Sequence, residues 1–121
     1  MSEAQKIEVN TEFDVFMARM QVRNLARAIG FDITSQARVA LATSSLARAL
    51  RLGDTYRGYF LVNGLQSEGR SGVQVSCKVF SVDDFEFSSR TLADVKWLVD
   101  ELTVEELPSN ELQVTLVKWM V

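Results

Sequence analysis

The residues that could do chemistry in this chain of 121 residues are few in kind. Asp83, Asp84 and Glu86 form its densest carboxylate cluster, and oxygen ligands so close together could hold a divalent cation. A solvated loop is the interpretation that we favour for them. The chain has no histidine and one cysteine, which excludes a serine–histidine pair, a histidine base and a cysteine zinc site. The inventory of catalytic side chains is therefore thin.

Cys77 alternates with valines in a segment whose pattern is typical of a strand with one buried face. Since no histidine is present to lower its pKa, we expect Cys77 to be a buried structural thiol. The glycines form neither a G-x-G-x-x-G pattern nor a Walker loop, so the sequence predicts no phosphate-binding loop.

Arginines four residues apart are the first candidates for binding a partner. Arg19, Arg23 and Arg27 would form a line along one helix, which suits bidentate pairing with carboxylates. We call these three residues the arginine ladder; a solvated face is the alternative. Phe85 and Phe87 stand in an otherwise polar segment and are the second candidates, as exposed anchors or as core residues. We expect Trp97 and Trp119 in the core.

Length and charge bound the class of protein. A chain of this size, with 47% hydrophobic and 24% charged residues, predicts one folded domain over residues 1–121. The net charge is −3, divided into +2 over residues 1–60 and −5 over residues 61–121. The sequence pI of about 4.9 argues against a nucleic-acid-binding protein. No apolar run is long enough to span a membrane and no signal pattern is seen, so we expect a cytoplasmic protein.

The first half of the chain has helical periodicity. Thr11, with Asp14 three residues later, predicts a helix start, and Gly30 predicts its end. The apolar side of this helix is expected to include the large residues Phe13, Phe16, Met17 and Met20, and to continue with Leu25 and Ile29. A second helix is expected to start near Thr34 or Ser35 and to be ended by Gly53 and Asp54.

The second half changes to a period of two, which is typical of strands. We expect an edge strand near Lys6–Asn10, strands at Tyr56–Gln66, Val73–Val82, Leu102–Leu107 and Glu111–Met120, and a third helix over Ser89–Asp100. The order predicts an α+β two-layer sandwich, with about three helices on one face of a four- or five-stranded, mostly antiparallel sheet. Its expected core includes Leu46, Ala47, Val75, Leu98 and Leu116.

Two stretches of the chain resemble one family. Ala18–Gly30 (ARMQVRNLARAIG) and the following residues 31–49 are similar to the opening of the bacterial anti-sigma-factor serine/threonine kinases, which have the histidine-kinase-like ATPase (Bergerat) fold. Residues 93–102 and 112–119 are similar to the family's last helix and final strands. The resemblance implies a Bergerat-like fold and regulation through protein partners.

The same resemblance places unusual residues at the family's nucleotide site. Ser45 and Ala49 stand where the family has a glutamate that positions the attacking group and an asparagine that holds Mg²⁺. Residues 80–96 contain no glycine, whereas the family has a glycine-rich lid over the phosphates. We therefore interpret Ser45 and Ala49 as vestigial positions. From these departures we expect no catalytic residue, no metal and no cofactor, and a non-catalytic protein rather than an enzyme.

The predicted function is an interaction module in bacterial sigma-factor or stress-type partner switching. By resemblance, its partner would be a sigma factor, a STAS-domain protein, a kinase-like relative or a second copy of the chain. Two alternatives stay open: an active ATP-dependent anti-sigma-factor kinase with atypical motifs, and an unrelated small α+β interaction domain.

Overall fold

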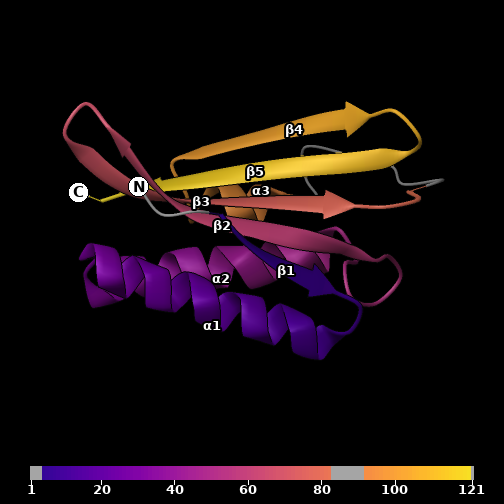
Figure 1. Cartoon of the computed structure of the whole chain (residues 1–121), viewed down its shortest axis with the longest axis horizontal. Helices are drawn as coiled ribbons and strands as arrows, with labels where there is room; N and C mark the ends of the chain where they lie inside the picture. Colours follow the sequence, from indigo (N-terminus) through magenta and orange to yellow (C-terminus); the bar gives the residue numbers. More distant parts are fainter. Residues whose placement is uncertain (1–3, 83–91, 121) are drawn as a thin grey trace.

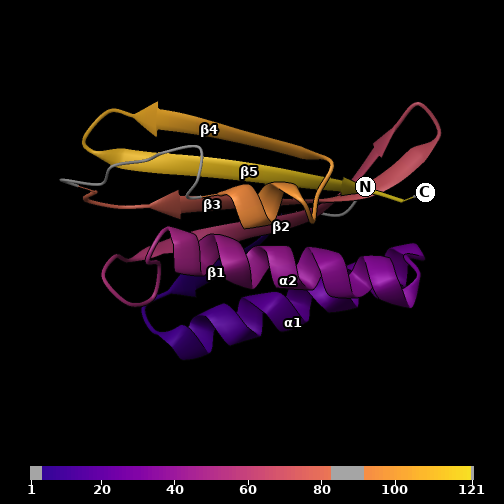
Figure 2. The ribbon, with the colours of Figure 1, turned by 180° about the vertical axis from the view of Figure 1, so that it is seen from behind.

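The computed structural model describes residues 4–82 and 92–120, which form two layers (Figure 1). A five-stranded antiparallel sheet is one layer, and the helices lie together on one of its faces (Figure 2). The described elements are, in chain order, β1 (Gln5–Val9), α1 (Glu12–Ile29), α2 (Ile33–Ala49), β2 (Gly58–Ser67), β3 (Arg70–Val79), α3 (Ala93–Lys96), β4 (Glu101–Leu107) and β5 (Glu111–Trp119). The predicted α+β sandwich is confirmed.

The strand order is β1-β2-β3-β5-β4, and every neighbouring pair is antiparallel. At the centre, Val75 lies opposite Val62 on β2 and Leu116 on β5. All three side chains are buried, because alternate residues of each strand point toward the helices. β1 and β4 are the edges of the sheet.

Both ends of α1 follow from local chemistry. The Asp14 carboxylate accepts hydrogen bonds from the backbone N–H groups of Asn10 (2.9 Å) and Thr11 (3.1 Å). These bonds, the one from Asn10 first, lower the pKa of Asp14. At the other end Gly30 adopts φ 114°, and its N–H reaches the carbonyls of Ala26 and Arg27. The left-handed conformation favours glycine and ends the helix.

The buried face of α1 is not the one that its large apolar residues suggest. Ala18, Val22 and Ala26 are fully buried. The exposed fractions of the large residues are 66% for Phe13, 55% for Phe16, 40% for Met17 and 45% for Met20. Of the predicted apolar side, Leu25 and Ile29 pack against the core, but these four large residues do not. The small side chains of the buried face let α1 lie close to α2 and the sheet.

The helix α2 supplies much of the core. The Asp32 carboxylate caps its start by accepting a hydrogen bond from the Ser35 N–H at 2.7 Å. Leu46 and Ala47 are buried as expected, as are Val75 and Leu116 in the sheet. Leu98 is only partly buried but packs against this core.

The helix α3 is much shorter than the predicted Ser89–Asp100, of which residues 89–91 lie outside the described part. Leu92 and Val95 are buried, whereas Trp97 is 86% exposed, so its expected place in the core is wrong. Trp97 is the C-cap of the helix, and the Asp100 N–H donates to the Val117 carbonyl just before the strand β4 begins.

Trp119 is also misplaced by the prediction, since it is only partly buried. Residues alternate along β5: Leu116 faces the helices, and Trp119 therefore lies on the opposite face of the sheet. There the Arg70 guanidinium lies 4.2 Å from the centre of its ring. In the described residues no helix is long and apolar enough to cross a membrane.

Candidate functional site

The positions that the resemblance relates to catalysis lie on one side of α2. Ser45 and Ala49 are one helical turn apart, and both are partly buried. Ala49 packs against the hydrophobic core. The side chain of Ser45 is a hydroxyl group and that of Ala49 a methyl group, and neither is a strong ligand for Mg²⁺. The described residues contain no group of three or more histidine, cysteine or acidic side chains that could hold a metal.

The arginine ladder lies on the exposed side of α1. Arg19, Arg23 and Arg27 are all exposed, as the sequence predicted, and no ion pair of theirs is found among the described residues. Because guanidinium groups are always charged, this side of the helix presents positive charge that no ion pair within the described ranges neutralises. Whether a partner binds there stays a prediction.

A hollow between the two long helices joins the ladder to further arginines. Its volume is about 310 Å³, and it is lined by Arg19 from α1, by Arg48 near the end of α2 and by Arg51 just after it. Phe16, Val15 and Ala47 contribute apolar surface, and Glu12 and Asp54 contribute carboxylates. Neither acid forms an ion pair with these arginines within 4.0 Å in the described part of the chain.

Sequence reasoning did not single out Arg48 and Arg51. Their spacing of three residues is the sequence pattern that could have identified them, since residues three apart near the end of a helix lie on one side of it. In the structure both line the same hollow as Arg19.

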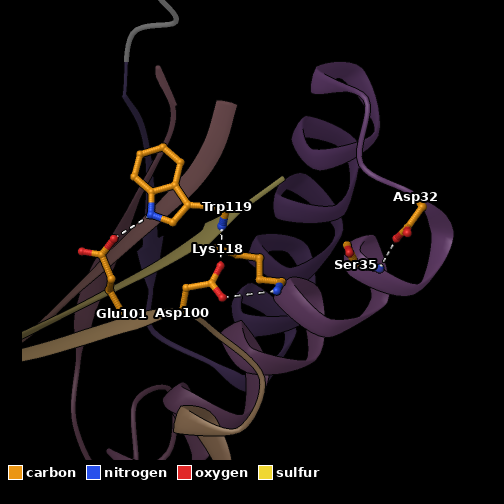
Figure 3. A network of polar contacts seen from close by, with 6 residues as sticks. All are labelled: Asp32, Ser35, Asp100, Glu101, Lys118 and Trp119. Atoms are coloured by element: carbon orange, nitrogen blue, oxygen red, sulfur yellow. Dashed lines mark hydrogen bonds and ion pairs between the residues drawn. The ribbon is translucent and has the colours of Figure 1, made fainter. Parts of the chain in front are cut away.

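A second cluster of charges fastens the end of β5 to its neighbours (Figure 3). The Lys118 ammonium lies 3.6 Å from the Asp100 carboxylate, and the residue is only 8% exposed. The same carboxylate accepts a hydrogen bond from the Trp119 backbone N–H at 2.7 Å, and the indole N–H of Trp119 donates to Glu101 at 2.6 Å. The charge of Lys118 also helps to lower the pKa of Asp32, after the larger effects of Ser35 and Arg38. We interpret this cluster as structural, because its described charged side chains are already paired with one another or with Trp119.

Cys77 is fully buried, as predicted, and burial raises the pKa of its thiol. Both observations fit the structural role expected for this thiol. The remaining candidates Phe85 and Phe87, like the carboxylates at 83, 84 and 86, lie outside the described residues.

Comparison with known proteins gives one significant relative among curated proteins. The chain is 26% identical over 133 aligned positions to the serine/threonine-protein kinase RsbT of Bacillus subtilis (strain 168), and the match covers 99% of each chain. No family model matches the sequence. The match supports the resemblance to the anti-sigma-factor serine/threonine kinases over the whole chain and not only at its two ends.

This relative corrects one expectation. We expected no enzyme, because Ser45 and Ala49 replace an acid and an amide and because residues 80–96 lack glycine. The relative that aligns from end to end is a kinase, which is an enzyme, and nothing in the structure shows that catalysis has been lost. Substituted motif positions alone were too narrow a basis for that expectation.

Proposed function

Because this chain is related to the anti-sigma-factor serine/threonine kinases, we propose that it is a partner-switching regulator that acts in sigma-factor control by binding another protein. The candidate partners are a sigma factor, a STAS-domain protein and a kinase-like relative. The observation that carries the proposal is the exposed arginine ladder, which lies on a helix of this fold with no ion pair in the described residues.

The charge distribution supports a protein as the partner. Residues 15–51 contain six arginines and one acidic residue, Asp32, although the whole chain carries −3. Arginine pairs with carboxylates in a bidentate way and is enriched in protein interfaces. A second copy of the chain is a further candidate, since residues 61–121 carry −5.

The experiment measures binding of the purified chain to sigma factors and STAS-domain proteins from its own organism, by calorimetry at low salt and at about 0.5 M salt. We expect one of them to bind, and we expect Arg19→Glu with Arg23→Glu to weaken binding by about tenfold or more. Sedimentation of the chain alone tests the homodimer. Binding that responds neither to salt nor to this charge reversal would exclude the ladder as the contact.

Phosphotransfer to a serine or threonine of the partner is the second candidate function. The end-to-end match to a serine/threonine-protein kinase favours it. The assay follows transfer of radioactive phosphate from ATP with Mg²⁺ to the partner that binds, with boiled protein as the blank. Ser45→Ala is the informative variant, because Ser45 is a polar, partly buried side chain at the position that resemblance relates to catalysis.

A further inference from the structure

The helix α1 has two apolar faces that point in opposite directions. At 100° per residue, Phe13, Phe16, Met17 and Met20 centre on a line about 180° from the line of Ala18, Val22 and Ala26. The second set is fully buried, and the first set is between 40% and 66% exposed. The packing of the described residues uses one face and leaves the larger side chains of the other in solvent.

Solvent-exposed side chains of these types, gathered on one helix, are characteristic of a binding surface. Phenylalanine, methionine and arginine are enriched in protein interfaces, and methionine adapts its shape to different partners. The rings of Phe13 and Phe16 already contact each other, with centroids 6.4 Å apart. We call these four residues the outer apolar stripe of α1.

Positive charge runs beside this stripe. Phe16 belongs to the stripe and also lines the hollow between α1 and α2, together with Arg19, Arg48 and Arg51. Arg23 continues the charge along α1. A partner that covers the stripe would therefore bring its flanking side chains up to several guanidinium groups that lack ion pairs in the described part of the molecule.

We propose that the outer apolar stripe and the adjacent arginines dock an acidic amphipathic helix of another protein. Its apolar side chains would pack on Phe13, Phe16, Met17 and Met20, and its carboxylates would pair with Arg19, Arg48 and Arg51. The spacing of the stripe is the i, i+3, i+4, i+7 pattern by which two helices pack together. This inference rests on the proposed function, since it names the chemistry of the bound protein.

A second copy of this chain fits the surface less well. Among the described residues, its acidic half presents most carboxylates on strands and turns, three of them (Glu101, Glu105 and Glu106) on the edge strand β4. Only Asp94 of these described carboxylates lies on a helix, and that helix, α3, has four residues. Glu101 is already bonded to the Trp119 indole. Val104 is the one exposed large apolar side chain of that strand. Charge and shape therefore favour a helix of a different protein.

The probe is a synthetic peptide of about 20 residues with leucines on one helical face and glutamates beside them. A peptide with lysine in place of each glutamate, and one of the same composition in scrambled order, serve as matched controls. Fluorescence anisotropy with the full chain should show binding of the acidic helix alone, weakening with salt. Equal binding of the lysine or scrambled peptide, or no binding of any, overturns the proposal.

Two double variants locate the contact. Phe16→Ala with Arg19→Glu should weaken binding of the acidic peptide by about tenfold or more. Phe80→Ala with Arg57→Glu changes the same residue types just after β3 and just before β2, respectively, and should leave binding unchanged. Circular dichroism confirms that each variant is folded, and peptide affinity unaffected by the first pair counts against the surface.

Failure of this inference differs from failure of the proposed function. If a sigma factor or STAS-domain protein binds the chain but is insensitive to Phe16→Ala with Arg19→Glu, the docking surface is wrong and the proposed function stands. If none of them binds, while the acidic peptide does, the proposed function fails and the surface stands. If the chain dimerises and Phe16→Ala abolishes the dimer, the second copy is the occupant and the acidic helix is overturned.

Discussion

Gly72 lies directly opposite Trp119 across β3 and β5, and the indole ring covers the place where a Cβ of residue 72 would be. An added Cβ would come 2.7 Å from Cε3 of the ring and 2.9 Å from the Lys118 carbonyl oxygen. Glycine normally weakens a strand, but here the flat ring packs over the backbone and shields it. The same ring contacts Arg70 and Glu101, so this glycine allows three strands to be joined by one side chain.

Replacement of Gly72 should therefore be costly. We expect Gly72→Ala to lower the free energy of unfolding by about 1–3 kcal/mol, because the carbonyl of Lys118 cannot move away as a flexible side chain could. Urea unfolding followed by circular dichroism measures the change. Ser71→Ala, at the adjacent position of the same strand, is the control and should stay within about 0.5 kcal/mol of the wild type. A Gly72→Ala protein of unchanged stability would contradict the close contact.

Truncation of a buried residue and of an exposed residue of the helical layer should change the free energy of unfolding by very different amounts. Leu46→Ala removes a fully buried side chain of α2 and should cost about 2–5 kcal/mol. Phe16→Ala removes a larger side chain that is 55% exposed and should change stability by no more than about 0.5 kcal/mol. Thermal unfolding of both variants compares them. A large loss for Phe16→Ala would mean that the outer apolar stripe belongs to the core.

The Asp32 cap makes stability depend on pH in a defined direction. Its hydrogen bond from Ser35 lowers the pKa of the folded carboxyl below the ordinary 3.8. The charged form is thus favoured by folding, so its contribution is complete above pH 3.8 and is lost as the pH falls through the folded value. Asp32→Asn keeps a capping oxygen but cannot titrate.

The measurement is urea unfolding of the wild type and of Asp32→Asn from pH 6 down to pH 2.5. The difference in stability between the two should be constant above about pH 5 and shrink below pH 3.8, because only the wild type becomes protonated there. Other carboxyls titrate in both proteins and cancel in the difference. A difference that grows on acidification would refute the cap.

The Asp100 carboxylate should matter through two partners at once. Asp100→Ala removes the acceptor of the Trp119 N–H and the counter-charge of the buried Lys118, and we expect a loss of about 1–3 kcal/mol. Asp100→Asn retains an acceptor and should recover part of this loss. Lys118→Met in the Asp100→Ala background should also recover stability, because it removes the unpaired buried charge. Thermal unfolding of the wild type, Asp100→Ala, Lys118→Met and the double variant measures the coupling between the two side chains, and strictly additive losses would exclude it.

Local chemistry in the sequence was enough to predict both ends of the first helix, whereas the second helix ends at Ala49, before the predicted Gly53 and Asp54. Thr11 with Asp14, and Gly30, bound the first helix because capping bonds and a left-handed glycine act within a few residues. The alternation around Cys77 predicted a strand with one buried face, since side chains in a strand point to opposite faces. The order of elements then allowed one architecture, which the structure has.

Tertiary packing decided what the pattern left open. Two faces of the first helix are apolar, and the sequence alone favoured the larger residues Phe13 and Phe16, whereas the structure buries Ala18 and Val22. Hydrophobicity alone does not determine which of two apolar faces is buried. The distance between a helix and its neighbours does, because a close approach requires small side chains. The same packing leaves Trp97 in solvent and brings Arg51 to Arg19, because residues far apart in the chain meet only once the helices have settled on the sheet.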